Sequence, residues 1–397
     1  MEITLCAPDL MPPPSARPPL VALTPAEVAG LQAELLAYHR EFAPLFRREE
    51  QRHWALKYTE GQLLPLERKS IEPMADALVG GNVQAMQQFI GVGAWGADAV
   101  LARHQQLVAE SLGDSATGVL IVDGCDFPKQ GTHSVGVARQ YRGPLGKVAN
   151  GQASLVACYA SARGYALVDR RLYLPEDWFT AAYRQRRRRC GVPPATPYRT
   201  RTELAWAMIA ELRRRGALPF AWVTGDEHFG QAPRLLDRIA AAGLCYLMEV
   251  PHPTRVWPER PATAVPPPTG KRGRPAARRR LAPGAPAAVR VDALAAHLPP
   301  AAWRRALLRE GSQGPLVAEL AFVRAVAVRG RLPGPDVWVV LRRTLGETPE
   351  LKAYLSTAPA DVPLATLVWL LGMRWPVEQA IKEAKEELGL DHYEVRR

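Results

Sequence analysis

Helical periodicity dominates the chain from residue 23 to residue 115. Apolar side chains recur every three or four positions in stretches such as AEVAGLQAELLAYHREFAPLF and ADAVLARHQQLVAESL, a spacing that predicts amphipathic helices. Thr24, Pro25 and Glu27 have the pattern of an N-cap, a first helical residue and a capping box, so the first helix is expected to begin there. Residues 1–22 are rich in proline, which predicts a disordered segment. The pattern indicates a helical N-terminal domain over residues 23–115.

Between residues 116 and 252, short apolar and alternating runs replace the helical period. Such runs are typical of strands. GVLIVDG is followed by HSVGVARQY and then by QASLVACYAS and YALVDRRLYL, and the last two join at a turn over residues 162–164. GVLIVDG and these last two runs predict three antiparallel strands in succession. A β-α-β unit is expected next, from a helix at 202–215, a strand at 220–226, a helix at 231–242 and a strand at 245–251.

The sequence pattern over residues 253–360 predicts a linker followed by a β-rich insertion. The linker is of low complexity around PPPTGKRGRPAARRR, and strand-like runs return at 316–328 and 337–345. A last helix is expected from about 363 to 388, within the segment 361–397. Three antiparallel strands followed by α/β units, with acids on the first and fourth strands, form the ribonuclease H-like order. We therefore expect an α/β (α+β) fold, a ribonuclease H-like mixed sheet with flanking helices.

Charge narrows the range of partners. The chain carries 51 Lys and Arg against 39 Asp and Glu, a net charge of +12, which favours a polyanionic partner, either nucleic acid or an anionic membrane. The longest apolar run, LATLVWLLGM, is well short of the roughly 20 residues that a membrane-spanning helix needs. The N-terminus lacks the pattern of a signal peptide, and the five cysteines lack the spacing of a zinc site or a disulfide framework. We expect a soluble, cytoplasmic protein without membrane contact.

Three acids stand where catalysis would need them. Asp123 closes the run GVLIVDG and Asp226 closes FAWVTGD, so each ends a predicted strand. In RWPVEQAIKEAK, steps of four and seven residues put Arg374, Glu378 and Lys385 on one face of a helix. If the two strands are neighbours, both aspartates lie at one edge of the sheet. A glutamate on a nearby helix would complete the set.

Metal binding is the chemistry that three such carboxylates suggest. Cleavage of a phosphodiester requires an activated water and a stabilised leaving oxygen, which two Mg²⁺ ions roughly 4 Å apart supply. Mg²⁺ prefers oxygen ligands, so carboxylates on rigid elements are suitable holders. We expect two Mg²⁺ ions per site, with Mn²⁺ as a substitute, held by Asp123, Asp226 and Glu378.

Each acid also has a purely structural explanation. Asp123 precedes a glycine and suits a turn, and Asp126 competes with it as the ligand. Asp226 and Glu227 suit a helix cap. Glu378 has lysines on its own helix face and suits a solvated surface. The case for catalysis therefore depends on the three acids occurring together in this chain order.

Basic residues follow the first acid. Lys129, Arg139 and Lys147 either line a track for DNA phosphates or are solvated hairpin charges. His133 and His228 are weak metal candidates, and we interpret both as polar loop residues.

Further along the chain, arginine runs occur at 184–189 and 213–215. Each run either faces DNA or forms a charged helix surface. Arg272 and Arg274 lie in KRGRP, which is similar to the minor-groove-binding core of an AT-hook, or belong to a plain linker.

Three sequence blocks resemble a known family. VDGCDFPKQGTHSVGVARQYRGPLGKVANGQ, WVTGDEHFGQ and RWPVEQAIKEAKEELGLDHYEVR are similar to the blocks that carry the first, second and third acids of bacterial insertion-sequence transposases of the DDE type. The group is the one with the signature Tyr-x2-Arg-x3-Glu-x6-Lys. The similarity extends from about residue 40 to the C-terminus.

The resemblance implies an activity and a set of roles. Asp123, Asp226 and Glu378 would hold the metals, and Arg374 and Lys385 would contact DNA near the cut. The reaction would be hydrolytic release of the element's ends, followed by attack of the freed 3′-OH on target DNA. The partners would be double-stranded DNA, as terminal inverted repeats and as target, and a second copy of the chain in a synaptic homodimer. The location would be the bacterial nucleoid, with the helical region 23–115 binding DNA.

The chain departs from the family's pattern at three points. Leu371 stands at the signature tyrosine, and Gly124 and Cys125 follow Asp123 where relatives carry an acid and a hydroxyl residue. The family's helical region would also continue beyond Arg397, so a truncated copy is expected. The missing tyrosine and the short C-terminus favour one rival, a catalytically impaired, transposase-derived DNA-binding protein. A further rival is an unrelated hydrolase or RNA nuclease.

Overall fold

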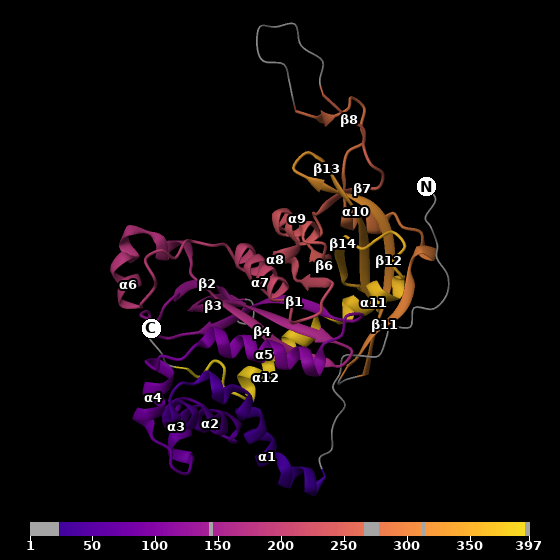
Figure 1. The fold of residues 1–397 in the computed structure, drawn as a ribbon. Coiled ribbons are helices and arrows are strands. Elements are labelled where there is room, and N and C mark those ends of the chain that lie inside the picture. The colour runs from indigo at the N-terminus through magenta and orange to yellow at the C-terminus, as the bar shows by residue number, and fades with distance from the viewer. Residues whose placement is uncertain (1–23, 143–145, 266–277, 312–313, 394–397) are drawn as a thin grey trace. The chain divides into compact units, whose positions relative to one another are not determined.

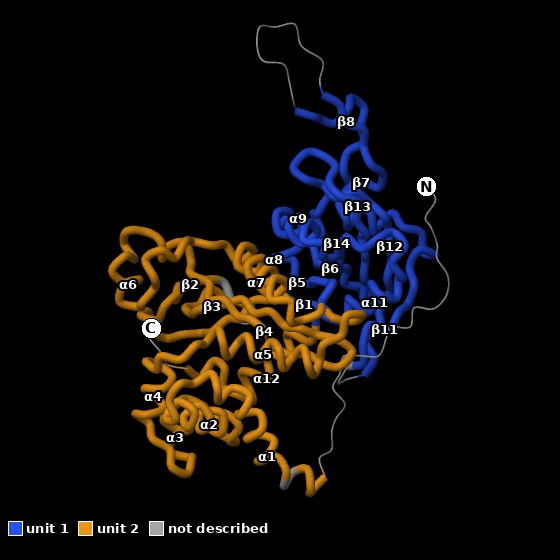
Figure 2. Tube along the Cα trace, in the orientation of Figure 1, with its two compact units in different colours: residues 1–15, 119–121, 220–374 blue, residues 16–118, 122–219, 375–397 orange. Residues whose placement is uncertain are grey.

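The computed structural model describes residues 24–142, 146–265, 278–311 and 314–393 (Figure 1). The predicted disordered segment 1–22 and the hook residues Arg272 and Arg274 lie outside the described residues. The chain forms two compact units (Figure 2). The described residues within 119–121 and 220–374 belong to unit 1, and those within 24–118, 122–219 and 375–393 belong to unit 2.

Unit 2 begins with helices, as the periodicity predicts. They are α1 (Pro25–Phe42), α2 (Glu49–Leu63), α3 (Ile71–Ala77), α4 (Val83–Gly91) and α5 (Ala97–Leu112). Thr24 caps α1, because its hydroxyl accepts from the Glu27 amide and the Glu27 carboxylate accepts from the Thr24 amide. Met74 and Met86 are fully buried, and Trp54 and Tyr58 pack against them. This small apolar core joins α2, α3 and α4.

The strands of unit 2 form an antiparallel meander. β2 (Ala138–Arg142) pairs with β3 (Lys147–Ser161), and β3 pairs with β4 (Gly164–Tyr173). β1 (Val119–Pro128) lies next to β3; its first three residues belong to unit 1 and the rest to unit 2. Residues 151–161 of β3 are all buried, because α7 (Arg201–Arg215) lies on one side of these strands and α5 and α12 (Trp375–Glu386) on the other (Figure 1). Helices on both faces explain why the strand is apolar without alternation.

Between β4 and α7 the chain forms short helices that the sequence pattern does not predict. Two 3₁₀ turns, Glu176–Phe179 and Ala181–Tyr183, precede α6 (Arg184–Arg189). α7 itself begins with a capping box between Thr200 and Glu203 and ends at Gly216 in the left-handed conformation.

Unit 1 contains the parallel part of the sheet. β5 (Trp222–Gly225) pairs in parallel with β6 (Cys245–Val250), and α8 (Glu227–Gly230) and α9 (Pro233–Ala241) connect them. β6 then pairs with β14 (Leu351–Ser356). The sheet continues through β13 (Leu332–Thr344), β12 (Gly314–Arg329), β7 (Arg255–Trp257) and β10 (Val289–Arg290), while β11 (Arg304–Gly311) also pairs with β12. The remaining elements are the two-stranded sheet of β8 (Thr263–Ala264) and β9 (Arg280–Leu281), and the helices α10 (Val291–Ala296) and α11 (Leu364–Gly372).

The predicted fold class is confirmed. Strands follow the order β4, β3, β1 in unit 2 and β1, β5, β6 in unit 1, which is the mixed order expected of a ribonuclease H-like sheet. Three expectations were incomplete. β2 is an additional strand beside the three predicted, the linker part of 253–360 contains β7, β10 and α10, and β11 and β14 are additional strands. The domain boundaries drawn from the sequence stay a prediction.

Two predictions about the acids and the last helix were wrong in detail. β1 continues to Pro128, so Asp123 lies within the strand rather than at its end. The helix expected at 363–388 is divided into α11 and α12, and Arg374 lies in the turn between them. Pro376, the second residue of α12, explains the break, because proline lacks an N–H to donate to the preceding turn and its ring clashes with that turn. No helix in the described residues combines the length and the apolar character needed to cross a membrane.

Candidate active site

Asp123 faces the side of β1 that α12 covers. Side chains alternate along a strand, so Asp123, Cys125 and Phe127 share one face. Phe127 packs against the Tyr393 ring, with 5.6 Å between centroids, and lies 5.4 Å from the ammonium of Lys385. Asp123 is half-buried, and its Oδ1 accepts a 2.7 Å hydrogen bond from the Gly124 amide. The alternation puts the competing Asp126 side chain on the other face.

Lys385 connects α12 to β1. Its Nζ donates a 2.8 Å hydrogen bond to the carbonyl oxygen of Asp126. A second link joins the same helix to β4, where the Tyr165 hydroxyl donates to the Glu383 carboxylate at 3.0 Å. Glu378 lies in the first turn of α12 and its side chain is exposed. The helix that carries the third predicted acid is therefore fixed against the strand that carries the first.

The Cys125 thiol reports the electrostatics of this region. Burial raises its pKa to about 11, and the carboxylates of Asp126 and Asp123 act in the same direction. The positive charge of Lys385 acts in the opposite direction. Cys125 is therefore a neutral, buried thiol next to β1's acids, where the relatives' pattern has a hydroxyl residue.

Asp226 follows β5 directly and caps α8. Its Oδ1 accepts from the amides of His228 at 3.0 Å and Phe229 at 3.4 Å. The capping explanation is therefore correct as a description of the local structure. It does not exclude a ligand role, because both bonds go to Oδ1 and Oδ2 accepts no hydrogen bond from the described residues.

Close packing fixes the position of this cap. At Gly230, in the only turn of α8, an added Cβ would lie 1.8 Å from the carbonyl oxygen of Glu249 on β6. Glycine is therefore required for α8 to pack on β6, and the carboxylate of Asp226 is held at the end of β5.

The predicted ligands are drawn from both units. Asp123 and Glu378 belong to unit 2, whereas Asp226 belongs to unit 1. The described residues contain no group of three or more His, Cys, Asp or Glu side chains placed to bind a metal ion. A metal site formed by Asp123, Asp226 and Glu378 therefore stays a prediction.

Arg374 has a buried acidic partner that the sequence did not reveal. Its Nη1 donates to Oε2 of Glu249 at 2.9 Å, and Lys352 donates to Oε1 of the same carboxylate at 2.9 Å. Glu249 is only 5% exposed. The one available signal was an acid inside the otherwise apolar run CYLMEV. Arg374 is therefore committed to an ion pair within unit 1.

The three basic residues after the first acid have different surroundings. Lys129 donates to the Tyr393 carbonyl oxygen at 2.8 Å, its Nζ lies 3.5 Å from the Tyr393 ring centroid, and burial lowers its pKa. Arg139 and Lys147 are both exposed. The β2–β3 register pairs Arg139 with Asn150, three positions from Lys147, so alternation places the two on opposite faces of the hairpin. Their contact with DNA stays a prediction.

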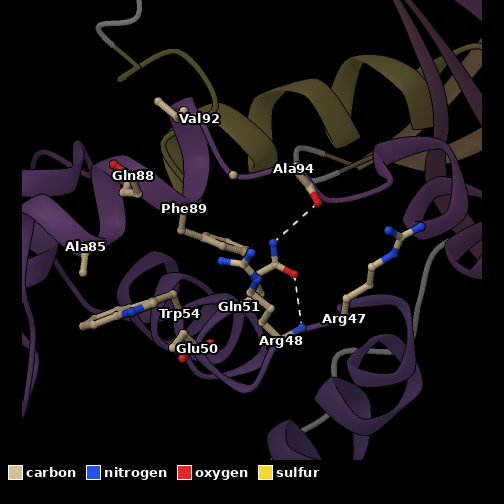
Figure 3. Close-up of a pocket in the computed structure, with 11 residues that line it drawn as sticks. Arg47, Arg48, Glu50, Gln51, Trp54, Ala85, Gln88, Phe89, Val92 and Ala94 are labelled. Atoms are coloured by element: carbon tan, nitrogen blue, oxygen red, sulfur yellow. Dashed lines mark hydrogen bonds between the residues drawn. The ribbon is translucent and has the colours of Figure 1, made fainter.

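The helical region contains a groove of about 630 Å³ (Figure 3). The side chain of Gln51 lies between two backbone groups, accepting from the Arg48 amide at 3.4 Å and donating to the Ala94 carbonyl at 3.5 Å. Arg47 and Trp54 also line the groove. Residues 25–112 hold eleven Asp and Glu against eight Lys and Arg, so the excess positive charge of the chain lies elsewhere. DNA binding by this region stays a prediction.

Comparison with known proteins decides the family. A family model described as DDE superfamily endonuclease matches residues 41–315, more than two thirds of the chain. The chain belongs to the DDE superfamily endonucleases. The match includes Asp123 and Asp226, and Glu378 lies beyond it. Endonucleases of this superfamily generally use divalent metal ions and act on DNA. A search of curated proteins found no match.

Proposed function

We propose that this DDE endonuclease is an insertion-sequence transposase that cuts DNA at the ends of its element and joins those ends to target DNA. In the first step water attacks the phosphodiester, the bond from phosphorus to the 3′ oxygen breaks, and a 3′-OH and a 5′-phosphate remain. In the second step the freed 3′-OH attacks a target phosphodiester, and the displaced 3′ oxygen becomes the leaving group.

The observation that carries this proposal is the bond from Lys385 to Asp126, because it supports an approach of Glu378 to Asp123. Seven residues of helix separate Glu378 from Lys385, about 10 Å along the axis. Three residues of strand separate Asp123 from Asp126, also about 10 Å. If α12 runs in the same direction as β1, these matching intervals would bring the two carboxylates to the same level. Asp123 also faces the side that α12 covers.

The donor set suits a divalent metal. Asp123, Asp226 and Glu378 offer only carboxylate oxygens, which Mg²⁺ prefers and Mn²⁺ accepts. Two such ions, when bound, would activate water and stabilise the departing 3′ oxygen. The chain's own contribution is rigidity: Asp226 is fixed as a helix cap on β5, Asp123 lies within a buried strand, and α12 is anchored to that strand at Lys385.

The DNA contacts belong to the same proposal. Lys385 and Arg374 flank Glu378, and their charges would hold phosphates near the cut. Lys129, Arg139 and Lys147 would contact the duplex beyond it. Arg374 also bonds Glu249, and Lys129 also bonds the Tyr393 carbonyl, so both residues help to hold the fold as well. Arg272 and Arg274 would extend the contact into a minor groove. Two copies of the chain would bring the two terminal inverted repeats together.

The test uses a supercoiled plasmid that carries the DNA flanking the coding frame on both sides. Wild-type protein with Mg²⁺ or Mn²⁺ should nick and release the segment between the inverted repeats. Asp226→Asn should abolish cleavage, with a loss of at least about 100-fold, while melting at an unchanged temperature. Glu227→Gln is the matched control, since its exposed neighbouring carboxylate has no proposed role. Normal cleavage by Asp226→Asn would reject the proposal.

One observation favours the catalytically impaired alternative. Leu371, at the signature tyrosine, is buried in α11, so no hydroxyl is presented there. The same plasmid assay separates the two functions. Specific binding to the terminal repeats without nicking, under any divalent metal, would select the DNA-binding protein.

A further inference from the structure

The strongest concentration of unneutralised charge in unit 2 is α6. Residues 174–201, which connect β4 to α7, contain seven arginines and two acids. Five of the arginines form α6 itself. Within the described part of the chain, no carboxylate forms an ion pair with any of these five. The arginine run 213–215 of α7 differs, because Glu211 pairs with both Arg214 and Arg215 at 2.8 Å.

The arginines of α6 are sorted by helix geometry into two sets. Arg184, Arg188 and Arg189 are exposed, and we call them the arginine platform. Arg186 and Arg187 are half-buried and face the protein. Positions 184 and 188 are one turn apart, so their guanidinium groups lie on the same side of the helix.

Aromatic rings contact the two half-buried arginines on the inner face of α6. The Arg186 guanidinium lies 5.1 Å from the Trp178 ring centroid and 5.3 Å from that of Tyr183. The Arg187 guanidinium lies 4.7 Å from the Phe179 ring centroid. Such cation–π contacts fix the inner face of the helix without neutralising its charge. Arg186 and Arg187 therefore cover these rings. Bases stack on exposed rings, so covered rings favour a surface that contacts phosphates.

The segment is attached to the loop that follows β1. Trp178 is fully buried, and its Nε1 donates to the Val137 carbonyl oxygen at 3.1 Å. At the end of α6, the Cys190 thiol donates to the His133 carbonyl oxygen at 3.3 Å. Both acceptors lie in the connection between β1 and β2. The platform is thus tied to the chain that leaves the strand carrying Asp123.

We propose that the arginine platform binds the phosphate backbone of duplex DNA. This inference rests on the proposed function and deepens it by naming a surface that positions the substrate. Arginine presents a planar fork of donors that matches phosphate oxygens. A short, rigid helix with three exposed forks contacts successive phosphates without reading bases, so binding depends on salt and not on sequence.

The experiment measures binding of a short fluorescein-labelled DNA duplex by anisotropy at several salt concentrations in Ca²⁺, without Mg²⁺ or Mn²⁺. Arg188→Ala with Arg189→Ala removes two platform charges. Arg213→Ala with Arg214→Ala removes two adjacent exposed charges at the end of α7 and is the matched control. The platform variant should lose roughly tenfold in affinity, and the slope of log affinity against log salt should fall by about 1 to 2. The control should bind nearly as wild type does.

Each other outcome overturns the proposal. Equal losses in the two variants would mean that binding follows net charge alone. Unchanged binding by the platform variant would mean that α6 does not touch the duplex. A loss for single-stranded RNA of the same length, without a loss for DNA, would assign the platform to RNA. Lysine replacements at positions 188 and 189 should preserve the salt slope, which separates charge from folding defects.

Asp226→Asn in the same assay separates this inference from the proposed function. Retained duplex binding by Asp226→Asn with lost cleavage supports the transposase whatever the platform does. A platform variant that loses binding, in a protein that cuts no DNA, supports the platform and rejects the transposase.

Discussion

The ammonium group of Lys385 donates to the backbone carbonyl of Asp126 at 2.8 Å, across 259 residues of sequence. The bond anchors the end of α12 against β1, and the Phe127 ring lies beside the same ammonium. A lysine that a sequence signature assigns to DNA is therefore also part of the framework of unit 2. The two roles have different consequences when the side chain is replaced.

Replacing Lys385 should lower both stability and cleavage. Lys385→Met keeps much of the apolar stem but removes the charged hydrogen bond, so the free energy of unfolding should fall by about 1.5 to 3 kcal/mol. Urea unfolding measures the change. Lys382→Met is the control, because Lys382 is exposed and forms only a loose ion pair, at 3.8 Å, with the Glu386 carboxylate. The free energy of unfolding of this variant should fall by at most about 0.5 kcal/mol. If the two variants unfold alike, the anchor is not energetically important.

Removing the Glu249 carboxylate should be costly. Glu249→Gln leaves Arg374 and Lys352 facing a neutral, buried amide, and breaking a buried ion pair on one side typically costs about 3 to 5 kcal/mol. Chemical denaturation should detect the loss. Asp336→Asn provides the comparison, since Asp336 pairs with Arg260 at an exposed position and should cost about 0 to 1 kcal/mol. A small change in the free energy of unfolding of Glu249→Gln would show that Arg374 and Lys352 are hydrated by solvent in the variant.

Alkaline pH should weaken the fold through Cys125. The folded protein holds the thiol pKa at about 11, above its ordinary value of 9.0. As pH rises from 9 to 11, the unfolded chain therefore releases its thiol proton while the folded chain retains it, so stability falls. The loss attributable to this thiol is about 2 to 3 kcal/mol.

Cys125→Ala provides the control for that pH effect. The variant lacks the titrating group, so the stability difference between wild type and variant should shrink between pH 9 and pH 11. Denaturant unfolding at each pH measures it. A constant difference over that range would mean that Cys125 ionises at its ordinary pKa in the folded protein.

Local rules predicted much of the fold. The capping box at Thr24 and the apolar runs of β1, β3, β5 and β6 are local signals, and the elements they indicate are present. The break before α12 was also predictable in principle, because Pro376 cannot continue a preceding helix. The spacing of Arg374, Glu378 and Lys385 obscured that break. The steps of four and seven residues fit one continuous helix, although Arg374 lies in the turn before α12.

Other features depend on contacts between distant segments. Glu249 looks like an isolated acid in a strand until Arg374 and Lys352 are placed around it. The face of β1 occupied by Asp123 is set by the contacts of Phe127 with Lys385 and Tyr393, which lie more than 250 residues further along the chain. The two arginine runs look alike in sequence, and only Glu211 in the preceding turn distinguishes the paired run from the unpaired one.

The tie between β1 and α12 has a consequence during synthesis. A nascent chain that has left the ribosome through residue 360 already contains Asp123 and Asp226 but has no helix to cover Phe127. Contacts that close loops of this length form late, because the entropy of closure must first be overcome. If the proposed function holds, DNA cleavage would begin only once translation has passed Lys385, and unfinished polypeptides would be kept from cutting the genome that encodes them.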